Sequence, residues 1–255
     1  MRTYSVSSDV KRATFSKGFL FGILGMVLMI AIASLSSISS LFGSNQALPN
    51  GYHASLILKA LSSQDVMLVL PIICTLPFTA AFVDDIKCGF IKPYLQRSGV
   101  NKYIQGKLFA CGLSGGLVLF LGIVAAYGLS ALIFTPMELA LSHGQIAQPY
   151  FAQVLMIAAM FFLSGAFWSL VGCTLAALTM SRYMAYASPF IMYYVLIILH
   201  ERYFQELYVF YPKEWLYPSV SWILGSFGVI LLLAELTAII CLAFIITAKR
   251  RFRNV

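Results

Sequence analysis

Long intervals without an ionised side chain are the feature that most constrains this chain. No residue that is charged at neutral pH lies between Lys17 and Lys59, and similar intervals recur along the rest of the sequence. A helix needs about 20 mostly apolar residues to cross the roughly 30 Å hydrocarbon core of a bilayer. The intervals predict six membrane-spanning helices, at Gly18–Leu41, Val66–Val83, Leu108–Phe134, Phe151–Met180, Met184–Leu199 and Ser219–Ala248.

The composition excludes a water-soluble globule. Hydrophobic residues make up 60% of the 255 residues, charged residues make up 10%, and the mean hydropathy is +0.88. A typical soluble domain is about 45–50% apolar and about 25% charged. So few charges do not cover the surface of a soluble protein of this length. We therefore expect residues 1–255 to form a single all-α integral membrane domain in a lipid bilayer.

The basic residues predict the orientation of this domain. All but three of the 17 Lys and Arg residues fall in segments 1–17, 84–107, 181–183 and 249–255, which share one side of a six-helix path. Cytoplasmic segments carry an excess of basic residues, so we expect both termini in the cytoplasm and the protein in the cell membrane. The net charge of +8 then reflects attraction to anionic lipid headgroups rather than to nucleic acid.

Motifs for catalysis and nucleotide binding are missing from the sequence. It contains no G-x-x-x-x-G-K-[ST] loop for ATP phosphates and no H-E-x-x-H. The three histidines are far apart, and the five cysteines lack metal-site spacing. We therefore expect no enzyme activity in this chain, and no catalytic, metal or cofactor site.

Residues 84–107 are the one sizeable connection on the predicted cytoplasmic side. Gly99 is placed to end a helix in the left-handed conformation, after a break at Pro93. A second helical stretch is expected from Val100 into the third span, with Lys102 and Lys107 at the level of the lipid headgroups. Apolar side chains before the break recur at helical spacing: Ile86, Phe90, Ile91, Tyr94 and Leu95.

The residues alone leave two interpretations of this connection open. It is either a solvated loop whose charges only fix the topology, or a short helix across the membrane face that docks into a cytoplasmic partner. Basic amphipathic segments also rest on lipid without any protein partner.

One pattern within this connection is similar to a known family. It is an acid, a glycine, Ile-Lys, Leu, Arg and Gly-Lys, at Asp85, Gly89, Ile91-Lys92, Leu95, Arg97 and Gly106-Lys107. Together with six spans, internal termini and a basic N-terminal segment, the chain resembles the permease subunits of ABC-2 type exporters. Many members have Glu and Gly-Thr where this chain has Asp85 and Gly89-Phe90.

The resemblance implies a role for the connection and for the partners. Segment 84–107 would form a coupling helix in a groove of a separate ATP-binding subunit, present in two copies that hold ATP and Mg. A second permease subunit, identical or a paralogue, would complete the transport path for a peptide, drug or lipid. Arg182, in the tight turn Met180–Tyr183, would make a minor second contact. The residues implied in coupling are Asp85, Gly89, Phe90, Ile91, Lys92, Tyr94, Leu95, Arg97, Ser98 and Arg182.

An aromatic segment, residues 200–218, lies on the predicted external side. Aromatic rings gather at membrane–water interfaces, so an ordinary interfacial belt is one interpretation. The resemblance implies instead two short helices that dip back into the membrane, and Pro212 favours two half-helices over one. The residues of this external gate would be Tyr203, Phe204, Tyr208, Phe210, Tyr211 and Trp215.

Single residues within the spans leave further alternatives. Glu235, near the middle of the sixth span, is either a functional acid or a carboxyl that is held neutral or hydrogen-bonded to a neighbouring helix. Gly18, Gly22 and Gly25 allow close helix approach, either to a second subunit or within the chain. Besides export, a non-transporting immunity or scaffold protein of the membrane fits the sequence.

Overall fold

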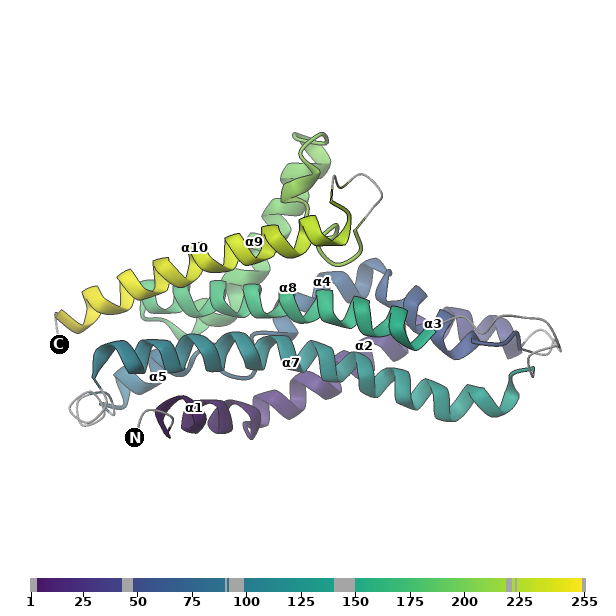
Figure 1. The fold of residues 1–255 in the computed structure, drawn as a ribbon, viewed down its shortest axis with the longest axis horizontal. Coiled ribbons are helices and arrows are strands. Elements are labelled where there is room, and N and C mark those ends of the chain that lie inside the picture. Colours follow the sequence, from purple (N-terminus) through teal and green to yellow (C-terminus); the bar gives the residue numbers. More distant parts are fainter. Residues whose placement is uncertain are drawn as a thin grey trace.

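The computed structural model describes residues 4–42, 48–89, 91, 99–139, 150–218, 222 and 224–253. Regular structure in these ranges is helical, apart from an isolated β-bridge between Leu48 and Glu138. Figure 1 shows the arrangement of the helices. In chain order they are α1 (Tyr4–Thr14), α2 (Lys17–Phe42), α3 (Tyr52–Leu61), α4 (Gln64–Ile73), α5 (Ala81–Lys87), α7 (Val100–Phe134), η1 (Thr135–Met137), α8 (Tyr150–Thr179), α9 (Arg182–Arg202), η2 (Tyr208–Phe210) and α10 (Ser226–Arg253).

Five helices in the described ranges are long and apolar enough to cross a membrane: α2, α7, α8, α9 and α10. The pair α3–α4, bent by 68°, makes a sixth if it is one span. The predicted all-helical architecture with several membrane spans is confirmed at this level. At 1.5 Å per residue, the 35 residues of α7 extend about 52 Å, so this helix continues beyond a roughly 30 Å hydrocarbon core.

The second predicted span, Val66–Val83, is interrupted. Helix α4 ends at Ile73, turns follow, and α5 begins at Ala81. Proline has no N–H, so Pro77 cannot donate to the carbonyl of Ile73. That carbonyl instead accepts a 3.3 Å bond from the N–H of Leu76. Pro77 therefore lies at a full break between α4 and α5, whereas the sequence predicted a single span that is only kinked at its prolines, Pro71 and Pro77.

The connection between α8 and α9 is as tight as predicted. Only Met180 and Ser181 separate the two helices, and Met180 has a positive φ of 54°. Helix α9 is longer at both ends than the predicted span of 184–199. Its terminal arginines fall outside the apolar stretch but still complete the helix.

Helices α7 and α8 form the centre of the bundle, where they run side by side (Figure 1). Helix α7 also packs against α1 and α2, and α8 against α9 and α10. Small residues allow the close approach of the central pair. A Cβ on Gly115 would lie 2.4 Å from the Cβ of Ser169, and one on Gly165 would lie 2.6 Å from Leu119.

Both marked termini lie at the same end of the bundle, on the left of Figure 1. This end also carries α1, α5, the first turns of α7, the α8–α9 turn and the last turns of α10. We call it the basic end, because the four basic segments of the sequence meet there. That it faces the cytoplasm remains a prediction.

Candidate functional site

A buried ion pair joins the two ends of segment 84–107 at the basic end. Asp85 lies on α5 and Lys107 lies two turns into α7, with Lys107 Nζ 2.7 Å from Asp85 Oδ2. Their side chains are 3% and 1% exposed, respectively. The prediction that Lys107 lies among lipid headgroups is therefore wrong, whereas Lys102 is exposed. Lys107 is stable inside the protein because carboxylate oxygens take the place of the water molecules that would otherwise hydrate its ammonium group.

Helix α1 supplies the second half of this cluster. Asp9 and Arg12 are three residues apart and so share one face of the helix. Lys107 Nζ donates to Asp9 Oδ1 at 2.9 Å, and Arg12 donates to Asp85 Oδ1 at 2.9 Å. The hydroxyl of Tyr103 donates to Asp85 Oδ2 at 3.0 Å. We call Asp9, Arg12, Asp85, Tyr103 and Lys107 the clamp, because they hold α1, α5 and α7 together.

The charges of the clamp are balanced and supported by aromatic rings. Lys107 Nζ lies 4.6 Å from the ring centroid of Phe78, within the range of a cation–π interaction. Burial alone would raise the pKa of Asp85, but attraction to Lys107 and hydrogen bonds from Lys107 and Arg12 outweigh it and lower that pKa. The clamp thus pairs two acids with two bases, and Asp85 and Lys107 are its buried centre while Arg12 is half exposed.

A second ion pair extends the clamp to α9. Arg182, at the start of α9, pairs with Asp84, the neighbour of Asp85 on α5. A cavity of 160 Å³ lies beside it, lined by residues of α1, α5 and α9 that include Arg12, Asp84 and Tyr186. The sequence analysis assigned Arg182 a minor contact with the ATP-binding subunit. In the structure it forms an ion pair with Asp84 of the same chain.

The other predicted coupling residues lie in or beside the connection. Gly89 has a φ of 70°, which favours glycine, and a Cβ there would meet no atom within 4 Å. Ile91 is 2% exposed and belongs to a core cluster with Phe82 and Tyr103. Gly99 has the predicted positive φ, 75°, but it precedes α7 with an extended ψ of 152°. The remaining predicted residues lie outside the described ones: Phe90, Lys92, Tyr94, Leu95, Arg97 and Ser98.

The external aromatic segment is anchored at one residue. Trp215 is 1% exposed, stacks on Trp168 of α8 at 6.0 Å and donates to the Val209 carbonyl at 2.8 Å. Tyr211 stacks on His200 at 4.2 Å and Tyr208 packs against a tryptophan, whereas Tyr203, Phe204 and Phe210 are exposed. The described part of residues 203–218 contains only the 3₁₀ turn η2, so the two half-helices are not confirmed.

Sequence reasoning missed a second polar cluster, at the opposite end of the bundle. Glu138, just beyond α7, accepts hydrogen bonds from the N–H of Gly51 at 2.9 Å and of His53 at 2.8 Å. It also lies 2.7 Å from His53 Nδ1, and Nε2 of that ring lies 3.3 Å from the hydroxyl of Tyr127. Burial would raise the pKa of Glu138, but these hydrogen bonds lower it. The cluster fixes the start of α3 against α7.

Glu235 lies on the exposed surface of α10. It has no hydrogen bond or ion pair to any residue that the structure describes, so neither a neighbouring helix nor a second acid partners it within this part of the chain. Among the same residues, no group of three or more His, Cys, Asp or Glu side chains is arranged to hold a metal ion.

Comparisons with known proteins do not identify a relative. No protein-family model matches the chain, and no significant match was found among curated proteins or solved structures. The resemblance to ABC-2 permeases therefore rests on the sequence pattern, while the clamp is an observation of this structure.

Proposed function

We propose that this chain is the transmembrane permease subunit of an ABC-2 type exporter. Two permease subunits, identical or paralogous, would enclose the transport path and pair with two copies of a separate ATPase. ATP and Mg would bind to those partners, so the chain itself would not be an enzyme. Its apolar spans and aromatic outer segment favour an amphipathic or hydrophobic cargo, such as a peptide, a drug or a lipid.

The clamp is the observation that carries this proposal. A loop that receives force from a partner must be anchored at both ends to the helices that move. The connection after α5 meets this requirement, because the 2.7 Å pair between Asp85 and Lys107 ties its two ends together. Asp9 and Arg12 add α1, and the pair between Asp84 and Arg182 adds α9.

This arrangement supports a mechanical role for each residue. ATP-driven closure of the ATPase pair would push on the connection around Arg97. Asp85 is 3% exposed and fully engaged by its neighbours, so we assign it to positioning rather than to contact with the ATPase. Rigid packed elements transmit such displacements as discrete rearrangements rather than by continuous deformation. The motion would reach α7 through Lys107 and α9 through Arg182, and α9 leads to the external segment.

The basic end supports a location in the cell membrane with this end in the cytoplasm. Basic residues are enriched on the cytoplasmic side of membrane proteins, and an ATPase requires cytoplasmic ATP. The external aromatic segment, held by Trp215, would then form the outer gate.

Co-purification with the ATPase tests the proposal. We expect a soluble ATPase to purify with the chain in stoichiometric amount and to hydrolyse ATP faster in the complex. Arg97→Glu should separate ATP hydrolysis from transport while membrane insertion is unchanged. Lys59→Glu, an exposed lysine at the opposite end of the bundle and outside the proposed gate, is the matched control and should leave coupling intact. A chain that binds a partner without nucleotide hydrolysis would instead be an immunity or scaffold protein, and the export proposal would be wrong.

A further inference from the structure

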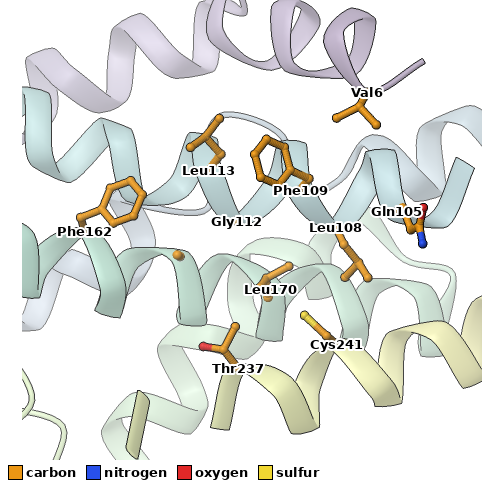
Figure 2. A pocket seen from close by; sticks show the side chains of 11 residues that line it. Val6, Gln105, Leu108, Phe109, Gly112, Leu113, Phe162, Leu170, Thr237 and Cys241 are labelled. Atoms are coloured by element: carbon orange, nitrogen blue, oxygen red, sulfur yellow. The ribbon is translucent and has the colours of Figure 1, made fainter. Parts of the chain in front are cut away.

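An apolar groove with a volume of 590 Å³ lies between α1, α7, α8 and α10 (Figure 2). This volume is within the 300–1,000 Å³ that is typical of small-molecule sites. Figure 2 shows Leu108 of α7, Leu170 of α8 and Cys241 of α10 converging on it. Along α7 the lining runs from Gln105 to Leu113, about 12 Å at 1.5 Å per residue. This length is close to the thickness of one leaflet, half of a roughly 30 Å hydrocarbon core.

A cavity of 260 Å³, lined by two isoleucines and three polar residues, lies beside the groove towards the basic end. Gln105 lines both spaces, so they lie next to each other at this residue. Asn101 and Lys249 supply the other polar side chains of the cavity. Within the described ranges none of these three side chains has a hydrogen-bond or ion-pair partner, and Lys249 is exposed.

The apolar groove and the neighbouring cavity with Lys249 together fit one molecule that has an acyl chain and an anionic headgroup. We propose that the groove and the adjoining cavity bind one anionic phospholipid from the leaflet at the basic end. An acyl chain would lie along Leu108, Leu170 and Cys241, and the phosphate would lie at Lys249. The amides of Gln105 and Asn101 would donate hydrogen bonds to the phosphate and glycerol oxygens.

A second copy of the chain fits the groove less well. Both copies must insert with the same orientation, so a two-fold axis along the membrane normal at the groove would bring the two Lys249 residues next to each other at the same depth. The basic segments around them would repel each other. A phospholipid with a negative headgroup has the complementary charge instead. This inference needs the groove and Lys249, and it does not rest on the coupling role proposed above.

Native mass spectrometry of the purified full-length chain tests the proposal. The chain is delipidated and then given equal amounts of phosphatidylglycerol and phosphatidylcholine with identical acyl chains. One basic residue near the headgroups contributes about fivefold in binding, so we expect about a fivefold preference for the anionic lipid. Lys249→Gln should reduce this preference to parity. Lys59→Gln, an exposed lysine at the opposite end, should leave the preference unchanged.

A second variant tests the groove itself. Thr237 lies on the groove wall of α10 and is only partly buried, so Thr237→Phe fills the groove without disturbing the core. This variant should lose retention of both lipids while its thermal unfolding stays like that of the wild type. Inorganic phosphate alone should not stabilise the chain. Equal retention of the two lipids by the wild type, undiminished retention by Thr237→Phe, or stabilisation by phosphate alone would each overturn the proposal.

Discussion

The ion pairs of Lys107 should dominate the stability of the basic end. Replacing it with methionine leaves Asp85 and Asp9 buried without their ammonium partner, and Asp9 Oδ2 already lacks a hydrogen bond to any described residue. Removal of one partner of a buried pair costs about 3–5 kcal/mol. We therefore expect Lys107→Met to lower the free energy of unfolding by about this amount, measured by denaturant titration in detergent.

Lys102→Met is the matched control, because Lys102 is an exposed lysine on the same helix. It should change stability by less than about 0.5 kcal/mol. The pH dependence gives a second measurement. Since the pKa of Asp85 is lowered in the folded protein, its contribution is fully present above about pH 3.9, the ordinary value for aspartate, and is lost as the pH falls through the folded value. Equal effects of the two lysine variants would contradict a buried ion pair.

Glu235 should oppose insertion of α10 into the bilayer. Its side chain is exposed on the span, and translocon measurements assign about 2.5–3.5 kcal/mol to a charged side chain at the centre of a helix. We expect Glu235→Leu to favour insertion by about 2–3 kcal/mol, measured from the glycosylation of flanking tags. Glu206→Leu, outside the spans, should have no effect. If Glu235→Leu reduced the amount of assembled protein, the carboxyl would instead bind a partner subunit.

At the residue scale, the sequence identified members of the clamp but not their pairing. Asp85 and Lys107 stood out because they belong to the pattern that is similar to ABC-2 permeases. Their partners on α1 are 73 and 98 positions away in the chain, and no local pattern links such positions. The spacing of Asp9 and Arg12 on one helical face was the available signal.

Close packing at the start of α2 should make Gly18 intolerant of any side chain. A Cβ at this position would lie 2.2 Å from the carbonyl oxygen of Leu76, whereas a Cβ on Gly25 would meet nothing within 4 Å. We expect Gly18→Ala to destabilise the protein by about 1–3 kcal/mol and Gly25→Ala to leave it nearly unchanged. Thermal unfolding of the two purified variants checks this. Similar melting temperatures would show that α2 does not pack on the broken second span.

At the element scale, helices bounded by charges were predictable and the broken span was not. Lysine or arginine marks the start of α2 and the end of α10, where the change from lipid to water is abrupt. Helix α3 was missed because it has ten residues and contains Lys59, which ended the apolar interval. Gly18 and Gly22, considered for contact with a second subunit, pack within the chain against Leu76 and Val118.

The orientation of the whole molecule can be measured at one native cysteine. Cys88 is exposed at the basic end, next to α5, whereas Cys74, Cys111 and Cys173 are buried. If the basic end is cytoplasmic, a membrane-impermeant maleimide should label the protein in inside-out vesicles and not in intact cells. Cys88→Ser should abolish this labelling.

Lys59→Cys in the Cys88→Ser background gives the converse control, because Lys59 is exposed at the opposite end of the bundle. This variant should be labelled in intact cells. Labelling of Cys88 from outside intact cells would place the clamp and the connection on the outer face, where no ATP-driven partner operates. The proposed coupling would then fail, while the lipid groove would remain testable in the other leaflet. The side on which Cys88 is labelled thus tests the proposed coupling to an ATPase, and it leaves the packing of the helices in the structure unaffected.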